Sequence, residues 1–70
     1  MTAGQIVTVN GTDYKVIFAD DCSSTPNLRK FMDEHGFALY IGLEKASGRG
    51  HYAYQAFANA NGNLTHLTRA

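Results

Sequence analysis

The side chains best suited to nucleophilic or metal chemistry in this sequence are one cysteine and three histidines. Cys22 stands just before a predicted helix, where the helix dipole favours a thiolate. Its candidate partners are His35, His51 and His66. None of them has metal-ligand spacing to another histidine or to Cys22, and nothing in the sequence places one beside the thiol. We therefore expect an incidental loop cysteine, with no metal, no cofactor and no catalytic residue.

Two other short stretches contain groups that bind ions in many proteins. Asp20 and Asp21 precede the predicted helix and could hold a cation, but carboxylates at this place also serve as capping and dipole partners. The glycine-rich Ser47–Gly50 could cradle an anion, yet it lacks the Lys-Ser/Thr ending of a phosphate loop and leads into a strand. We interpret the first as a capping pair and the second as a flexible hairpin tip.

The stretch Arg49–Phe57, RGHYAYQAF, offers a different kind of chemistry. Tyrosine combines a large rigid apolar ring with a hydroxyl group, so it suits a binding surface. The aromatic residues alternate with other residues as in a β-strand. Whether these rings pack inside the protein or contact a partner depends on the elements that position them.

A hairpin is predicted within Gln5–Ala19, because Asn-Gly lies between two alternating β-branched runs. The side chains fall on the same two faces whether the loop has two or four residues. The apolar face consists of Val7, Val9, Tyr14, Val16 and Phe18. The other face consists of Ile6, Thr8, Lys15 and Ile17.

A helix is predicted from Pro26 to just before Gly36. Ser24 or Thr25 can cap it, proline suits its first position, and glycine can adopt the left-handed conformation past its end. Its apolar stripe consists of Leu28, Phe31, Met32 and a partly buried His35. The spacing also permits ion pairs of Arg29 with Asp33 and of Lys30 with Glu34. Because the helix is short, only packing on a sheet will hold it.

A second hairpin is predicted within Phe37–Ala60, followed by a short edge strand in Leu64–Ala70. The order of elements is ββαβββ. The predicted fold class is therefore α+β, a small antiparallel β-sheet with one helix packed on one face, and residues 1–70 form a single domain.

Strand alternation assigns the side chains of the second hairpin to faces if Lys45 pairs with His51. The face available to the helix would then contain Phe37, Leu39, Ile41, Leu43, Ala53, Gln55 and Phe57. The opposite face would contain Tyr40, Gly42, Glu44, Tyr52, Tyr54, Ala56 and Ala58, extended by Thr65, Leu67 and Arg69. Since one helix cannot cover both faces, we expect the tyrosine face to be partly open to solvent.

Leu39–Gly42 (LYIG) and Arg49–Phe57 resemble the two short motifs of the RNA-recognition motif family, in which sheet aromatics stack on bases. The resemblance implies stacking rings at Tyr40, Tyr52 and Tyr54 and a phosphate contact at Arg49. It covers under half of the chain, and the predicted tight hairpin joins two strands that a helix separates in that family. The order of elements therefore excludes membership, although stacking on such rings remains chemically reasonable.

Composition narrows the class of protein. Six basic and six acidic side chains balance, so no global field attracts duplex nucleic acid. The first residues lack the features of a signal peptide, no stretch is long enough to span a bilayer, and a single cysteine suits a reducing compartment. We expect a cytoplasmic protein without membrane contact. A chain of 70 residues buries only about 60% of its unfolded surface, so self-association is a common aid to stability.

The sequence therefore predicts a small non-enzymatic binding module. It would act through the tyrosine face on a protein partner, as an inhibitor, adaptor or regulator, or on itself as a homodimer. The predicted partner-binding residues are Tyr40, Arg49, Tyr52, Tyr54, Leu67 and Arg69. The alternative is single-stranded nucleic-acid binding by aromatic stacking on the same face. Pairing of an open first or last strand offers a second route to a dimer.

Overall fold

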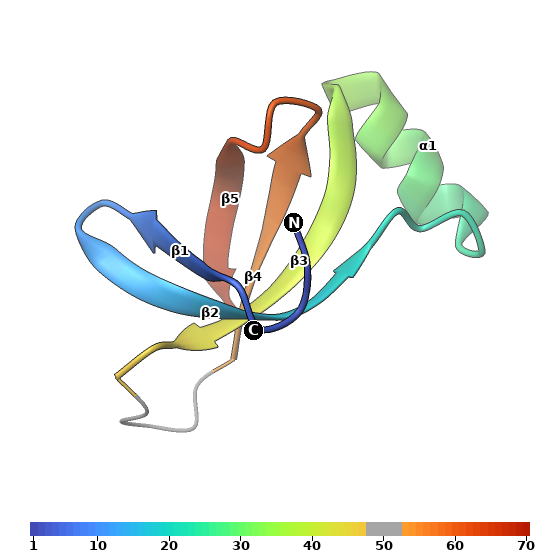
Figure 1. The fold of residues 1–70 in the computed structure, drawn as a ribbon. Helices are drawn as coiled ribbons and strands as arrows, with labels where there is room; N and C mark the ends of the chain where they lie inside the picture. The colour runs from blue at the N-terminus through green and yellow to red at the C-terminus, as the bar shows by residue number, and fades with distance from the viewer. Residues whose placement is uncertain (48–52) are drawn as a thin grey trace.

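The computed structural model describes residues 1–47 and 53–70. Five strands form one antiparallel sheet in the order β1-β2-β3-β4-β5, with one helix between β2 and β3 in the chain (Figure 1). The elements are β1 (Ile6–Val9), β2 (Thr12–Asp20), α1 (Pro26–His35), β3 (Phe37–Lys45), β4 (Ala53–Asn59) and β5 (Leu64–Arg69). The predicted α+β class and the order ββαβββ are confirmed.

The β1–β2 hairpin has the two-residue loop that Asn-Gly favours. Val9 pairs with Thr12, so only Asn10 and Gly11 lie between the strands. Both have positive φ, 51° and 81°, as the tight hairpin turn with two left-handed residues requires. The twist of this turn matches that of the strands, which explains why the local signal was sufficient to predict it.

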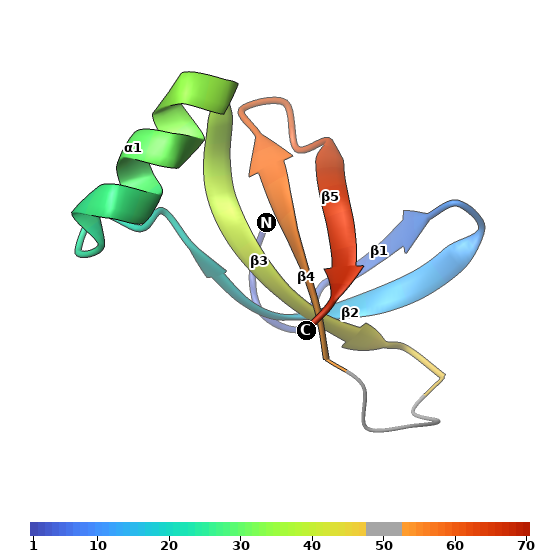
Figure 2. The same cartoon turned by 180° about the vertical axis from the view of Figure 1, so that it is seen from behind.

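Helix α1 begins and ends at the predicted residues. Pro26 occupies its first position, and Gly36 adopts φ 73° just past its end, with its N–H directed at the carbonyls of Asp33 and Met32. Thr25 is the N-cap residue, but its side chain makes no capping hydrogen bond. Figure 2 shows α1 beside one end of β3, the strand that it packs on. Within the described residues, no helix is long and apolar enough to cross a membrane.

Arg29 fastens this helix to the rest of the chain. Its guanidinium donates to Asp33 Oδ1 at 2.7 Å, the predicted ion pair. It also donates to the backbone carbonyl of Asp21 at 2.6 Å and to that of Phe37 at 2.7 Å, with a longer bond to Ala38. One side chain thus ties the loop before α1, the helix itself and the start of β3. The backbone carbonyls of Asp21 and Phe37 thus accept charge-assisted hydrogen bonds from the guanidinium.

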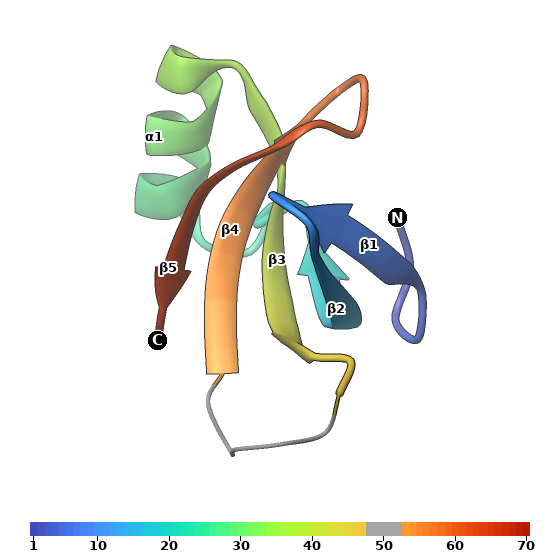
Figure 3. The same ribbon diagram turned by 90° about the vertical axis from the view of Figure 1, so that its left-hand side faces the viewer.

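The main core lies on one face of the sheet, called here the inner face. It consists of Tyr14, Val16, Ile41, Leu43, Ala56 and Ala58. Val16, Ile41 and Leu43 are fully buried, although α1 does not cover them. The sheet itself curls around these side chains, and Figure 3 shows the β1–β2 hairpin and α1 on opposite sides of β3 and β4. Met1, Val7, Val9 and Leu64 complete the enclosure.

The register of β3 and β4 corrects the predicted faces. Leu43 pairs with Tyr54, and Tyr40 pairs with Phe57, one residue away from the predicted register. A shift of one residue moves every side chain of β4 to the other face. Tyr54 therefore joins Ile41 and Leu43 on the inner face, whereas Phe57 joins Tyr40 on the opposite face. The prediction of one tyrosine face was wrong, because loop length alone did not define the pairing.

Two register shifts between paired strands further change which side chains share a face of the sheet. A register shift between Val16 and Phe18 leaves Ile17 unpaired and turns Phe18 away from the inner face, where the sequence pattern had placed it. A second shift between Phe37 and Leu39 separates these two side chains. Phe37 packs with Cys22 and Met32 beneath α1, whereas Leu39 belongs to the inner core.

The helix therefore covers the face that contains Tyr40 and Phe57, and not the face of Ile41 and Leu43 as predicted. This face is called here the helix-side face. His35, which was expected to be partly buried, is exposed at the end of α1.

Candidate interaction surface

The predicted partner-binding residues do not form one surface. Tyr40 lies on the helix-side face, in contact with the cluster beneath α1. Tyr54 and Leu67 pack on the inner core, and Arg69 pairs directly with Tyr54 across the strands, so it shares that face. Arg49 and Tyr52 lie outside the described residues, as does His51. A partner-binding role for these residues stays a prediction.

Tyr54 has a structural environment on the inner face. Its ring makes an edge-to-face contact with Tyr14, with 5.3 Å between centroids. The Lys45 Nζ lies 6.0 Å from the same ring, at the limit of a cation–π contact. These contacts account for Tyr54 as a core residue at the rim of the curled sheet.

The helix-side face instead contains a continuous cluster of rings, called here the aromatic surface. It consists of Phe18, Phe31, His35, Tyr40, Phe57 and His66. Centroid distances along the cluster are 5.7 Å from Phe18 to Tyr40, 5.4 Å from Tyr40 to Phe57 and 5.6 Å from Phe57 to Phe31. Rings from β2, α1, β3, β4 and β5 are thus joined into one surface, at separations typical of attractive aromatic pairs.

The two ends of the aromatic surface are open to solvent. Phe18 is 43% exposed and Phe31 is 38% exposed. Between them Tyr40 and Phe57 are half-buried, and the nearly buried Phe37 stacks on Phe57 with a centroid distance of 4.8 Å. The Tyr40 hydroxyl donates to Gln55 Oε1 at 2.6 Å, which fixes the ring between its neighbours. The rings therefore hold each other in place while presenting apolar area outward.

Two β-bulges determine the direction in which two of these rings point. The bulge at Ile17 places Phe18 opposite Gly42, where the absence of a side chain leaves room for the phenyl ring. In β5 the register against β4 shifts between Gln55 and Phe57. His66 adopts φ 57° at this shift and makes edge contacts with Phe37 and Phe57. Sequence alternation could not reveal either ring, because each bulge reverses the alternation that follows it.

Cys22 is buried beneath α1 with no sign of an activated thiol. Burial, followed by the charge of Asp20, raises the pKa of the Cys22 thiol above its usual value. Asp20 Oδ1 accepts the Cys22 backbone N–H at 2.9 Å, and Asp21 Oδ1 accepts that of Ser23 at 3.0 Å. The hydrogen bonds from Ser23 lower the pKa of Asp21. Both carboxylates thus build the turn before the helix. Their hydrogen bonds go to the loop and do not cap α1, whereas the sequence interpretation had expected a capping pair.

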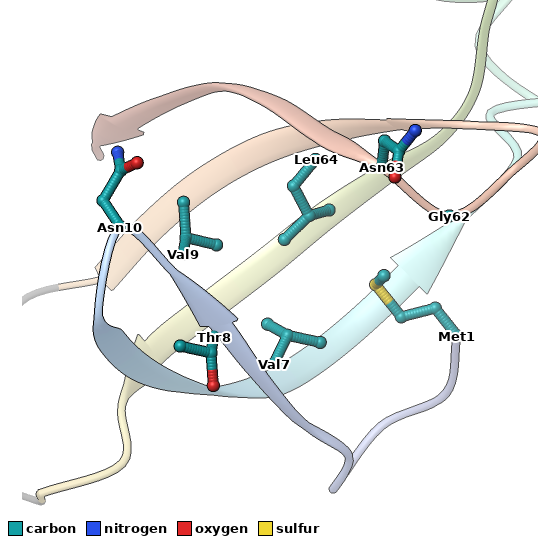
Figure 4. Close-up of a pocket in the computed structure, with 8 residues that line it drawn as sticks. All are labelled: Met1, Val7, Thr8, Val9, Asn10, Gly62, Asn63 and Leu64. Atoms are coloured by element: carbon teal, nitrogen blue, oxygen red, sulfur yellow. The ribbon is translucent and has the colours of Figure 1, made fainter.

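A groove on the inner side lies between the two edges of the sheet. Its volume is about 310 Å³, and its walls include Met1, Val7, Val9, Asn10, Asn63 and Leu64. Figure 4 shows Val7, Val9, Leu64 and Met1 converging in the gap between β1 and the β4–β5 turn. None of the wall residues has a charged side chain, and four of them are apolar, so this groove suits apolar side chains.

Across residues 1–47 and 53–70, no group of three or more His, Cys, Asp or Glu side chains gathers to hold a metal ion. Comparison of the chain with protein-family models, with curated proteins and with solved structures found no match. Any function proposed for this protein must therefore rest on its own geometry.

Proposed function

We propose that this protein is a non-enzymatic binding module that docks another protein on the aromatic surface, as an inhibitor, adaptor or regulator. The observation that carries the proposal is the unbroken run of rings from Phe18 to Phe31, open to solvent at both ends. The proposal includes a cytoplasmic location, which the unpaired thiol of Cys22 supports.

Clustered, exposed aromatic residues are favourable for binding a protein. They offer large apolar area, and exposed apolar patches on small proteins often mark interaction sites. Because neighbouring rings already restrict one another, little side-chain entropy is lost when a partner covers them. Aromatic residues are also enriched among the few interface residues that contribute most of the binding energy.

Attachment of the helix explains only part of this cluster. It accounts for Tyr40 and Phe57, which pack against the buried cluster beneath α1. It does not account for Phe18, which comes from β2 and packs on Tyr40 and over Gly42. This ring remains 43% exposed and so offers apolar area for a partner to cover.

Single-stranded nucleic acid is less well suited to this surface. Stacking on rings must be accompanied by cations that contact phosphates. Arg29 already donates to carbonyls and to Asp33, and Arg69 is on the inner face with Tyr54. The chain has no net charge, which favours a neutral protein surface as the partner.

The test is differential capture from extract of the source cells with three immobilised baits. These are the wild type, Phe31→Ser and the matched control Ile6→Ser, whose side chain is 52% exposed on β1, a strand that contributes no ring to the aromatic surface. We expect a protein that is retained by the wild type and by Ile6→Ser and is lost from Phe31→Ser. For the purified partner, the loss in binding free energy should be about 2 kcal/mol or more, as for an interface residue that contributes much of the affinity.

Two outcomes would contradict the proposal. One is a partner that Phe31→Ser and Phe18→Ser each retain as well as the wild type does, when circular dichroism shows both variants folded. The other is steeply salt-dependent binding of a fluorescent oligothymidine that both substitutions abolish, which would instead support the nucleic-acid alternative.

A further inference from the structure

The sheet has two edges, and the outer side of β1 presents unpaired backbone groups. Gln5 and Val16 are hydrogen-bonded, with 2.8 Å from Val16 N to Gln5 O, and Val9 pairs with Thr12 across the tight turn. Alternation then directs the backbone N–H and C=O of Ile6 and Thr8 away from β2. Among the described residues, no backbone hydrogen bond outside the β1–β2 ladder involves either of them.

Apart from its length of four residues, this edge lacks the features that usually prevent strand addition. Ile6–Val9 contains no charged residue, no proline and no bulge. Ile6 is 52% exposed, the largest exposed fraction among the large apolar side chains described. The other edge differs, because β5 has the register shift at His66 and the charged Arg69. Of the two edge strands, β1 is therefore better suited than β5 to pair with another strand.

The groove beside β1 would accept the side chains of an added strand. Val7 and Val9 point into it from β1, and Leu64 faces them from the start of β5 (Figure 4). A strand paired with the free edge would direct every second side chain to the same face as Val7 and Val9. Only another extended backbone supplies both this apolar row and partners for the N–H and C=O groups of Ile6 and Thr8.

We infer that the added strand is β1 of a second copy of this chain, paired antiparallel about a two-fold axis. Antiparallel pairing makes the edge complementary to itself, as a symmetric dimer requires. The uncharged strand allows two copies to meet without repulsion, and a chain of 70 residues gains burial that it cannot obtain alone. Val7 and Val9 of the second copy then add to the apolar groove.

The dimer would have a consequence for binding. Each dimer would carry two aromatic surfaces, so a partner with two matching sites would bind with avidity. The dimer itself uses other residues than the aromatic surface and does not depend on the function proposed for it.

Sedimentation equilibrium of the full chain from micromolar to millimolar concentration tests the inference. We expect a monomer–dimer equilibrium that Ile6→Glu weakens by about tenfold or more, because it removes apolar burial and brings two carboxylates together. Lys15 pairs with position 6 across β1 and β2, so the monomer retains its fold. Ile17→Glu is the matched control, since Ile17 is 46% exposed on an inner strand, and it should leave the equilibrium unchanged.

Amide hydrogen exchange identifies the surface that is used. The outward N–H groups of Ile6 and Thr8 should exchange rapidly at low concentration and about tenfold or more slowly when the dimer forms. The inference is overturned if the chain stays monomeric at millimolar concentration. It is equally overturned if a dimer forms without protecting these two amides, or if Ile6→Glu and Ile17→Glu weaken it equally.

Discussion

The ring of Phe18 occupies the space that a β-carbon on Gly42 would need. A Cβ added at Gly42 would overlap Phe18 Cε1 and would lie 2.6 Å from Cδ1 and 2.8 Å from Cζ. These two residues pair across β2 and β3, immediately after the bulge at Ile17. The bulge and the glycine thus act together to lay a large ring on the helix-side face, where it also contacts Tyr40.

Gly42→Ala should therefore destabilise the protein by about 1–3 kcal/mol, because the added methyl group displaces the Phe18 ring. Urea unfolding of the wild type and the variant measures this difference. In a Phe18→Ala background the same substitution should be neutral or stabilising by up to about 1 kcal/mol, since glycine weakens a strand relative to alanine. An equal cost in both backgrounds would show that the ring is not the obstacle.

Arg29→Lys should lower the free energy of unfolding by about 1–3 kcal/mol. Lysine retains the charge, but a single ammonium group cannot reach Asp33 and the carbonyls of Asp21 and Phe37 together. Thermal unfolding followed by circular dichroism measures the loss. The neighbouring Lys30→Ala, at an exposed position of the same helix, should change stability by less than about 0.5 kcal/mol. If Arg29→Lys behaves like this control, the carbonyl contacts do not hold the helix.

The buried Cys22 should make the protein less stable in alkaline solution. Its folded pKa is raised above the ordinary value of 9.0, so the unfolded chain loses the thiol proton at a pH where the folded chain retains it. Unfolding then releases a proton, and stability decreases as the pH rises above about 9. Cys22→Ala removes this contribution while leaving the lysines and tyrosines in place. The difference in urea midpoint between the two proteins should narrow between pH 8 and about pH 10.5; a constant difference would contradict the raised pKa.

The hairpin turn should distinguish between substitutions at Asn10. A β-branched residue is poorly suited to φ 51°, so Asn10→Val should cost about 1–2 kcal/mol. Asn10→Gly satisfies the same backbone geometry and should change stability by only a few tenths of a kcal/mol. Thermal unfolding gives both values. The exchange rate of the Tyr14 amide, opposite Val7, reports whether β1 remains paired. Equal stability of the two variants would mean that the turn conformation contributes little.

The sequence by itself determined the local features of this protein. Asn10 and Gly11 specify a turn through their own left-handed conformations, and Pro26 and Gly36 define the two ends of α1 through backbone restrictions. These signals act within a few residues, so they predict the order ββαβββ without knowledge of the sheet. The Arg29–Asp33 pair follows for the same reason, because helical spacing alone brings the two groups together.

Only the tertiary structure decided which side chains share a face. Side chains alternate between the two faces along a strand only as far as the next bulge. The bulges at Ile17, near Phe37 and at His66 depend on how neighbouring strands of the curled sheet pack on each other. The register of β3 with β4 depends on packing the inner core, which places Tyr54 beside Leu43 and leaves Tyr40 under the helix. A shift of one residue reverses every face of a strand. Long-range packing therefore formed the aromatic surface around Tyr40 and Phe57, whereas alternation had predicted a face of tyrosines.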